Sequence, residues 1–161
     1  MVILLMGVAG SGKTTVGRTL AAALGWRFRD ADEFHPPANL AKMSAGQPLT
    51  DADRVPWLAA IREYLDATIA RGENAVVTCS ALKIAYRPNL IADPLQVKLV
   101  HLTGDPAWIA ARLAGRRGHF MKPAMLASQL AELEPLRDAL TVDIAGTPDQ
   151  IVAQIRRVFA L

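Results

Sequence analysis

Residues 7–14 read Gly-Val-Ala-Gly-Ser-Gly-Lys-Thr, and this run limits the possible folds of the chain more than any other feature. The apolar residues 2–6 precede it, and residues 16–24 follow it with apolar side chains at helical spacing. A strand, a loop with the pattern G-x-x-x-x-G-K-[ST] and a helix, in that order, indicate a phosphate-binding loop. A glycine-rich turn that only packs a strand against a helix is the alternative. A dinucleotide fingerprint fits less well, because Thr15 stands where its third glycine belongs.

The residue types in this loop suit a polyphosphate. Glycines let the backbone turn so that successive N–H groups face phosphate oxygens, and a helix N-terminus adds partial positive charge. The Lys13 ammonium can reach β- and γ-phosphates, and the Thr14 hydroxyl can ligate Mg²⁺. We therefore predict that the nucleotide is held by Gly7, Val8, Ala9, Gly10, Ser11, Gly12, Lys13, Thr14 and Thr15.

Apolar strands alternate with amphipathic helices along the whole chain. This order predicts an α/β fold in three layers, with a parallel sheet covered by helices on both faces. At 161 residues the chain fits a single domain, 1–161, with inserted segments at about 33–70 and 116–125 that could close over a ligand. We expect strands at 2–6, 26–29, 75–79, 97–102 and 140–144, and helices at 13–24, 37–45, 51–70, 83–91, 106–115, 123–133 and 148–159.

Several helix starts carry capping residues. Thr50, Asp105 and Thr147 each stand just before a predicted helix, and Ser80 is expected to cap the helix at 83–91. The spacing of Thr50 and Asp53 suggests a capping box.

Composition argues against several classes of partner. The net charge is +3 and the basic residues are scattered, apart from Arg112, Arg116 and Arg117, so no nucleic-acid surface is indicated. Residues 2–6 are too short an apolar run for a signal peptide, and no apolar stretch is long enough for a membrane helix. Cys79 is the only cysteine, which excludes an intrachain disulfide. We expect a cytoplasmic protein with no membrane partner, and a buried Cys79 that is not a nucleophile.

Two carboxylates follow the predicted second strand. In an extended backbone Asp30 and Asp32 project to the same side, at the sheet edge where the phosphate loop also lies. One could hold Mg²⁺ through water, and the other could accept a proton from an acceptor hydroxyl. An acidic turn that only caps a helix is the alternative.

Positive and polar side chains mark the acceptor side. Arg54 suits a carboxylate or phosphate, although a surface ion pair to Asp51 or Asp53 is possible. Lys83 and Arg87 are four residues apart on one helical face, which would form a positive patch for an anionic acceptor. His35 could hydrogen-bond a substrate hydroxyl, or it is simply a histidine in a turn.

Arg112 and Arg116 are also four residues apart, near the predicted flap. Such arginines could stabilise the charge of a transferring phosphoryl group when the flap closes. A solvated helix end is the alternative.

These blocks together resemble the small phosphate-loop gluconokinases. The resemblance rests on the run 5–14, on Asp30-Ala31-Asp32 with His35-Pro36, and on Lys42-Met43. It continues through the blocks 46–58, 79–87 and 118–120, so that it spans residues 3–144. Ala31 departs from the glycine of many members, and alanine should be tolerated there unless the turn requires a positive φ.

The resemblance implies a P-loop NTPase fold of the shikimate-kinase-like or nucleoside-monophosphate-kinase-like type, with five parallel strands and a lid. It implies ATP- and Mg²⁺-dependent phosphorylation of D-gluconate at the 6-hydroxyl, and a homodimer. With that chemistry we assign Asp32 as base and Asp30 to the metal shell, although spacing alone leaves the two interchangeable. Arg54, Lys83 and Arg87 are the candidates for the acceptor carboxylate, and His35 and His119 for its hydroxyls. Lys13 and Arg116 would neutralise the transferring group.

A kinase of the same fold with another acceptor, such as shikimate, another sugar acid or a nucleotide, is the nearest alternative. Shikimate is less favoured because Ser80-Ala81-Leu82, and not a Gly-Gly-Gly run, follows the third strand. A nucleotide-binding regulatory module is the alternative from a different class.

Overall fold

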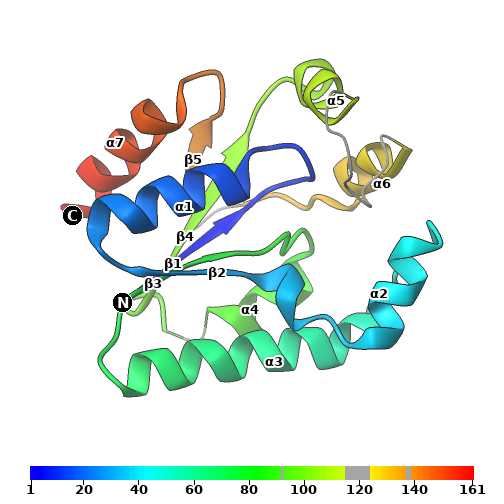
Figure 1. Cartoon of the computed structure of the whole chain (residues 1–161), viewed down its shortest axis with the longest axis horizontal. Helices are drawn as coiled ribbons and strands as arrows, with labels where there is room; N and C mark the ends of the chain where they lie inside the picture. The colour runs from blue at the N-terminus through cyan, green and yellow to red at the C-terminus, as the bar shows by residue number, and fades with distance from the viewer. Residues whose placement is uncertain (92, 115–123, 137–138) are drawn as a thin grey trace.

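The structure is a computed structural model that describes residues 1–91, 93–114, 124–136 and 139–161. Its five strands form one sheet in the order β2-β3-β1-β4-β5, and every neighbouring pair is parallel (Figure 1). The strands are β1 (Val2–Met6), β2 (Arg27–Asp30), β3 (Ala75–Thr78), β4 (Val97–Thr103) and β5 (Leu140–Asp143). The predicted α/β fold with a five-stranded parallel sheet is confirmed.

Helices cover both faces of this sheet. They are α1 (Lys13–Leu24), α2 (Pro37–Ser44), α3 (Asp51–Ala70), α4 (Arg87–Leu90), α5 (Pro106–Ala114), α6 (Ala124–Glu132) and α7 (Pro148–Phe159), with 3₁₀ turns η1 (Ala31–Phe34) and η2 (Ile84–Tyr86). Three of them, α1, α3 and α7, have the bounds that the sequence predicts. In the described ranges no helix has an apolar stretch long enough to cross a membrane.

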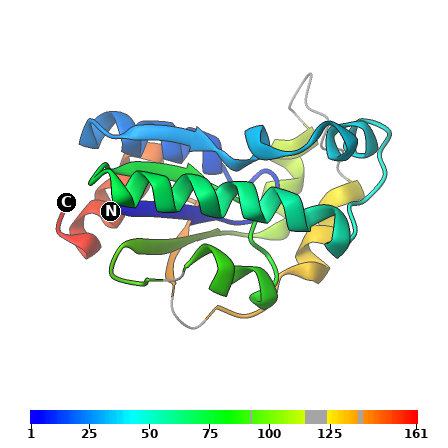
Figure 2. The ribbon, with the colours of Figure 1, turned by 90° about the horizontal axis from the view of Figure 1, so that it is seen from below.

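The alternation of side chains along β1 divides the core into two layers. Ile3 and Leu5 pack with α1, α5 and α7, whereas Val2, Leu4 and Met6 pack with α3 and α4. Figure 1 shows α1 and α7 above the sheet and α3 below it, and Figure 2 shows α3 lying along the lower face. Because β1 is buried on both faces and paired on both sides, it fixes the position of the loop that follows it.

The segment at 33–70, predicted as an insertion, forms the end of η1, α2 and the long helix α3. Capping fixes where α3 begins: the Thr50 hydroxyl accepts a hydrogen bond from the Asp53 N–H, and the Asp53 carboxylate accepts one from the Thr50 N–H. Thr147 forms the equivalent box with Gln150 at α7, and the Asp105 carboxylate accepts from the Ala107 N–H at α5. These predicted caps are confirmed.

The predicted helix at 83–91 is wrong in its extent. The segment forms the short turn η2 and the four-residue helix α4 instead. Pro88 explains the break, because a proline has no N–H to donate to the carbonyl four residues earlier. The predicted Ser80 cap is wrong as well: Lys83 occupies the N-cap position of η2, without a side-chain capping bond.

Close packing between α1 and the sheet generates a test of this architecture. A Cβ added to Gly17 would lie 2.7 Å from Phe28 Cε2 and 3.0 Å from Thr78 Cγ2. We expect Gly17→Val to lower the free energy of unfolding by about 1–3 kcal/mol, because an overpacked core must shift. Urea unfolding measures this loss. The control is Ala23→Val on the exposed side of α1, which should cost less than ~1 kcal/mol. Equal losses in the two variants would contradict the packing argument.

Candidate active site

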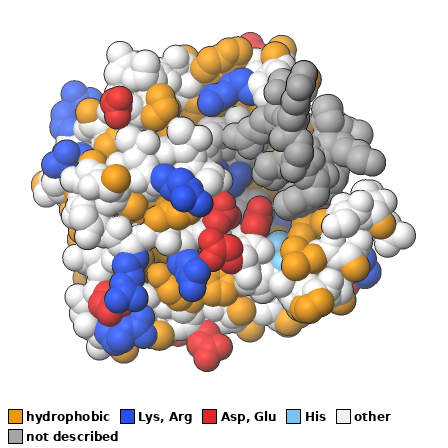
Figure 3. Space-filling model, in the orientation of Figure 1, with side chains coloured by type: hydrophobic (Ala, Val, Ile, Leu, Met, Phe, Trp, Pro, Cys, Tyr) orange, Lys and Arg blue, Asp and Glu red, His pale blue; other side chains and the backbone are white. Residues whose placement is uncertain are grey.

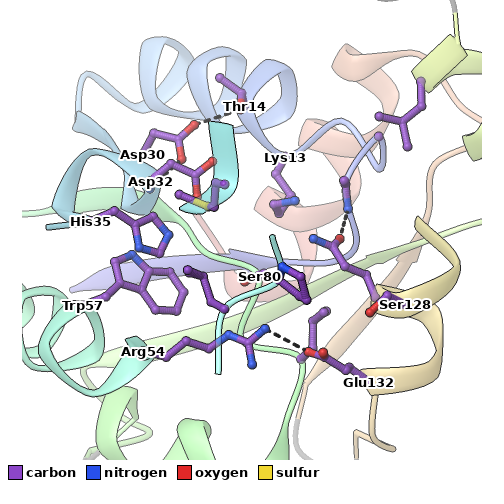
Figure 4. Close-up of a pocket in the computed structure, with 18 of the residues that line it drawn as sticks. Lys13, Thr14, Asp30, Asp32, His35, Arg54, Trp57, Ser80, Ser128 and Glu132 are labelled. Carbon is purple, nitrogen blue, oxygen red and sulfur yellow. Dashed lines mark hydrogen bonds and ion pairs between the residues drawn. The ribbon is translucent and has the colours of Figure 1, made fainter. Parts of the chain in front are cut away.

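A cavity of about 340 Å³ opens at the carboxyl ends of the strands, where ligands bind in parallel α/β sheets. The loop after β1, the acidic turn after β2 and Ser80 after β3 all reach it. Figure 3 shows acidic side chains and a histidine gathered in a hollow on this face, and Figure 4 shows its interior. The sequence-predicted residues that line it include Lys13, Thr14, Asp30, Asp32, His35 and Arg54.

The loop between β1 and α1 has the backbone of a phosphate cradle. Gly10 and Gly12 adopt φ values of 82° and 87°, which residues other than glycine rarely adopt. A Cβ on Gly10 would lie 2.8 Å from Leu113 Cγ, so α5 packs directly against the loop. The Lys13 ammonium donates to the Val8 carbonyl oxygen at 3.0 Å, which holds the lysine over the loop.

Ser11 is fully buried beneath the loop, and its hydroxyl has no hydrogen-bond partner in the described part of the chain. The Ser11 N–H donates to the Val8 carbonyl oxygen at 3.2 Å, so this residue helps to hold the turn of the loop.

Thr14 and Asp30 meet at the edge of the cradle. The Thr14 hydroxyl donates to Asp30 Oδ2 at 3.0 Å, and the other oxygen of Asp30 accepts from the Asp32 N–H at 3.2 Å (Figure 4). Hydroxyl and carboxylate oxygens next to a phosphate loop are the donors that Mg²⁺ takes from proteins, the remainder being water and phosphate. The residues present therefore fit Mg²⁺. A cage of three or more His, Cys, Asp or Glu side chains is not found among the described residues.

His35 is held flat against Trp57. The two rings stack with centroids 4.5 Å apart and planes 8° from parallel, and Trp57 Nε1 donates to the Ala31 carbonyl oxygen at 2.7 Å. Burial lowers the pKa of His35 to about 4, and the positive charge of Arg54 adds to this shift. The imidazole is therefore neutral at physiological pH.

Arg54 extends from the first turn of α3 into the cavity. Its guanidinium donates to Tyr86 Oη at 3.0 Å, Asp51 Oδ1 at 3.3 Å and Glu132 Oε2 at 3.2 Å. Its side chain is only 17% exposed, so these contacts are partly shielded from water. Arg54 therefore forms the ion pair with Asp51 that the sequence suggests as an alternative, and it also lines the cavity.

The comparisons with known proteins match this geometry. A family model described as shikimate kinase matches residues 9–157. A gluconokinase of Gluconobacter oxydans is 48% identical over 160 residues, which cover 98% of this chain and 90% of that protein. The chain belongs to the gluconokinase family. The structure of a gluconokinase from Sinorhizobium meliloti is 41% identical, has a TM-score of 0.83 and covers 98% of this chain and 94% of its own. An unliganded sugar kinase from Janibacter sp. is also 41% identical, with a TM-score of 0.92 and coverage of 99% and 94%.

This gluconokinase-family chain tolerates alanine at position 31, as expected. Ala31 is completely buried and is not among the residues with positive φ. Cys79 is buried too, and burial raises the pKa of its thiol to about 12, which agrees with the expectation of a small core residue and not a nucleophile.

Two predicted acceptor-binding residues lie outside the cavity lining. The Lys83 ammonium donates to Asp51 Oδ1 at 2.6 Å and belongs to the network around Tyr86. That pairing and the Tyr86 hydroxyl lower the pKa of Asp51 to about 2. The Arg87 guanidinium donates to the carbonyl oxygens of Ala81, Leu82, Glu134 and Pro135, which ties two loops together.

The arginines of the predicted flap are only partly placed. Arg112 Nη2 lies 3.7 Å from the Cβ position of Gly12, and its guanidinium stacks over the ring of Trp108 at 5.2 Å. It therefore stands next to the phosphate loop. Arg116 and His119, with most of the predicted lid at 116–125, lie outside the described residues.

Helix α6 contributes residues to the cavity that the sequence does not predict as site residues. Ser128, Gln129 and Glu132 line the cavity, and the side-chain oxygen Oε1 of Gln129 accepts from the Ala9 N–H of the phosphate loop at 2.6 Å. Polar residues three positions apart on an amphipathic helix were the available signal. The rule that site residues follow the carboxyl ends of strands does not identify them, because α6 comes after helix α5 and not after a strand.

The contacts of Arg87 predict a structural role for this residue. We expect Arg87→Lys to lower the free energy of unfolding by about 1–3 kcal/mol, since an ammonium cannot reproduce a planar set of bonds to several carbonyls. Thermal and urea unfolding measure the loss. Arg71→Lys, at an exposed ion pair with Glu73, is the control and should change stability little. Unchanged stability with a raised KM for the acceptor would instead favour the acceptor-binding role.

Proposed function

We propose that this protein transfers the γ-phosphoryl group of ATP to the 6-hydroxyl of D-gluconate, giving 6-phospho-D-gluconate and ADP. One observation carries the proposal: a single cavity has a phosphate loop on one wall and, on the other, a pair of carboxylates with a shielded arginine. The relatives named gluconokinase, at 48% and 41% identity over nearly the full chain, support this choice of acceptor.

Each wall would do one part of the reaction. Lys13 and the loop N–H groups would hold the phosphates, and Arg112 and Arg116 would add positive charge near the transferring group. Asp32, on the cavity side of η1, would accept the proton of the 6-hydroxyl as that oxygen attacks the γ-phosphorus. The reaction needs alignment and charge neutralisation more than covalent catalysis, which is what these groups provide.

Thr14 and Asp30 would hold Mg²⁺, because their oxygens are already adjacent at the cradle. When bound, the ion would neutralise the phosphate oxygens and fix their orientation. Asp32 lines the cavity together with the phosphate-loop residues Lys13 and Thr14, which supports the assignment of Asp32 as base.

The acceptor carboxylate would pair with Arg54. This guanidinium faces the cavity, and its neighbours Asp51 and Glu132 keep the cluster with Lys83 close to neutral. His35 would bind a hydroxyl. Lys83 and Arg87 would not contact the acceptor; they would hold in place the residues around Arg54 that form this wall.

We also propose a homodimer that works in the cytoplasm, with the segment 116–125 closing over the bound substrates. The single buried cysteine is compatible with a reducing compartment. Light scattering after gel filtration, in the presence and absence of substrates, tests the dimer.

The decisive experiment offers Mg-ATP with a panel of acceptors: aldonic acids, sugars, shikimate and nucleoside monophosphates. ADP release identifies the acceptor, and NMR of the product locates the phosphate. We expect turnover with D-gluconate and a 6-phosphate product. Turnover with shikimate or a nucleotide, and none with D-gluconate, would show that the proposed acceptor is wrong. Turnover only in the presence of a protein partner would favour a regulatory module.

Replacing the proposed base tests the mechanism. We expect Asp32→Asn to lower kcat by about a hundredfold or more while ATP still binds, because the amide cannot accept the hydroxyl proton. Steady-state kinetics and ATP calorimetry measure the two effects. Glu33→Gln is the matched control, since Glu33 is ion-paired with Arg29 on the surface and should leave kcat unchanged. Near-normal turnover of the Asp32→Asn variant would show that Asp32 is not the base.

Replacing the proposed carboxylate ligand tests the acceptor side. Arg54→Ala should raise the KM for D-gluconate at least about tenfold, as expected for the loss of a charge-assisted hydrogen bond, with a much smaller effect on ATP. Arg62→Ala, further along α3 in an ion pair with Asp66, is the control. A loss of affinity for ATP alone would contradict the role of Arg54.

A further inference from the structure

Asn39 is a buried polar residue that the catalytic scheme leaves unused. It lies on α2, its side chain is 3% exposed, and its amide nitrogen donates to the Asp53 carbonyl oxygen at 2.8 Å. A backbone carbonyl oxygen can only accept a hydrogen bond, so the atom facing it must be the NH₂ group. The orientation of the Asn39 amide is thereby fixed.

The same NH₂ group also faces His35. It lies 3.4 Å from Nδ1 of the imidazole, and an amide NH₂ can only donate. If Nδ1 carried a proton, two donors would face each other. Nδ1 must therefore be the acceptor nitrogen of a neutral ring, which leaves the proton on Nε2.

From this geometry we infer that Asn39 is a positioning residue for the proposed reaction, because it holds His35 as the Nε2–H tautomer and makes it a hydrogen-bond donor toward the acceptor. The inference rests on the proposed function for the identity of that acceptor. The ring itself is well fixed: Trp57 stacks on it, and Trp57 is in turn bonded to Ala31, between the two active-site carboxylates. The low pKa of His35 keeps the ring neutral, so that the tautomer decides what the ring can bind.

This tautomer defines a specificity element on the acceptor wall. Nε2–H donates to a lone pair, so the acceptor must present an oxygen there, while Asp32 in the same cavity accepts a proton from another hydroxyl. A donor and an acceptor at fixed places distinguish polyols by where their oxygens lie, because an analogue lacking that oxygen cannot accept the hydrogen bond from the half-buried imidazole. Asn39 contributes by preventing the ring from reversing its donor and acceptor edges.

The first test reads the tautomer directly in the unsubstituted protein. Two-dimensional ¹⁵N–¹H NMR of ¹⁵N-histidine-labelled protein at pH 7.5 distinguishes protonated from unprotonated ring nitrogens, and the His35→Gln variant assigns the signal. We expect a protonated Nε2 and an unprotonated Nδ1. A protonated Nδ1, or a rapidly exchanging mixture, overturns the inference. This measurement needs no turnover, so its failure leaves the proposed function intact, and a failure to phosphorylate D-gluconate leaves the tautomer intact.

The second test separates tautomer control from simple structural support. His35→Gln places an N–H near the Nε2 position and His35→Asn places one near Nδ1, so we expect Gln to keep a lower KM for D-gluconate than Asn. Asn39→Leu should raise that KM about tenfold, with kcat and the KM for ATP within about twofold of the original. In a His35→Leu background, Asn39→Leu should add no further increase. An equal increase in both backgrounds, or a better Asn than Gln variant, overturns the inference.

Discussion

The complete burial of β1 is the constraint on which the rest of the molecule depends. This strand is paired with β3 on one side and β4 on the other, and its side chains enter two separate apolar layers. The chain leaves it at the carboxyl edge of the sheet, where Gly7 has its Cβ position 2.6 Å from the Leu102 carbonyl oxygen. A strand fixed on all sides gives the phosphate loop a rigid base, and rigid placement is what phosphoryl transfer needs.

The two walls of the cavity differ in how they handle charge. On the nucleotide wall, backbone N–H groups and Lys13 offer positive potential with little opposing charge in the loop itself. On the acceptor wall, Arg54 has the carboxylates of Asp51 and Glu132 beside it, and the neighbouring Lys83 shares Asp51. An acceptor with one negative charge and several hydroxyls suits such a balanced wall better than a polyanion does, because its hydroxyls can replace hydrogen bonds without changing the net charge.

The sequence predicts well those features that arise from local periodicity. Helix α1, helix α3 and strand β1 were assigned to the observed residues because apolar spacing, caps and the glycine-rich loop all point to the same boundaries. The prediction of one helix at 83–91 is wrong because Pro88 interrupts the helical hydrogen bonds, and Ser80 does not cap it because the helical turn begins only after Lys83.

Site residues at the end of a strand were predictable from the sequence. Residues whose position depends on contacts between distant parts of the chain were less predictable. Asp30 is the last residue of β2 and Asp32 follows in η1, so the sheet topology brings both to the loop. Arg87 shares a face with Lys83 in an ideal helix, but its guanidinium is drawn to carbonyls from a loop nearly fifty residues away in the chain. Gln129 enters through a contact with Ala9 across 120 residues, which no local pattern encodes.

Helix α6 touches both walls within a single turn. Gln129 reaches the loop at Ala9, and Glu132, one turn further, reaches Arg54 on α3. Because one turn of helix rises about 5.4 Å, the backbone positions of these two residues lie at a fixed, short separation. Four consecutive residues of α6, 129–132, thereby join the phosphate loop to the arginine of the acceptor wall.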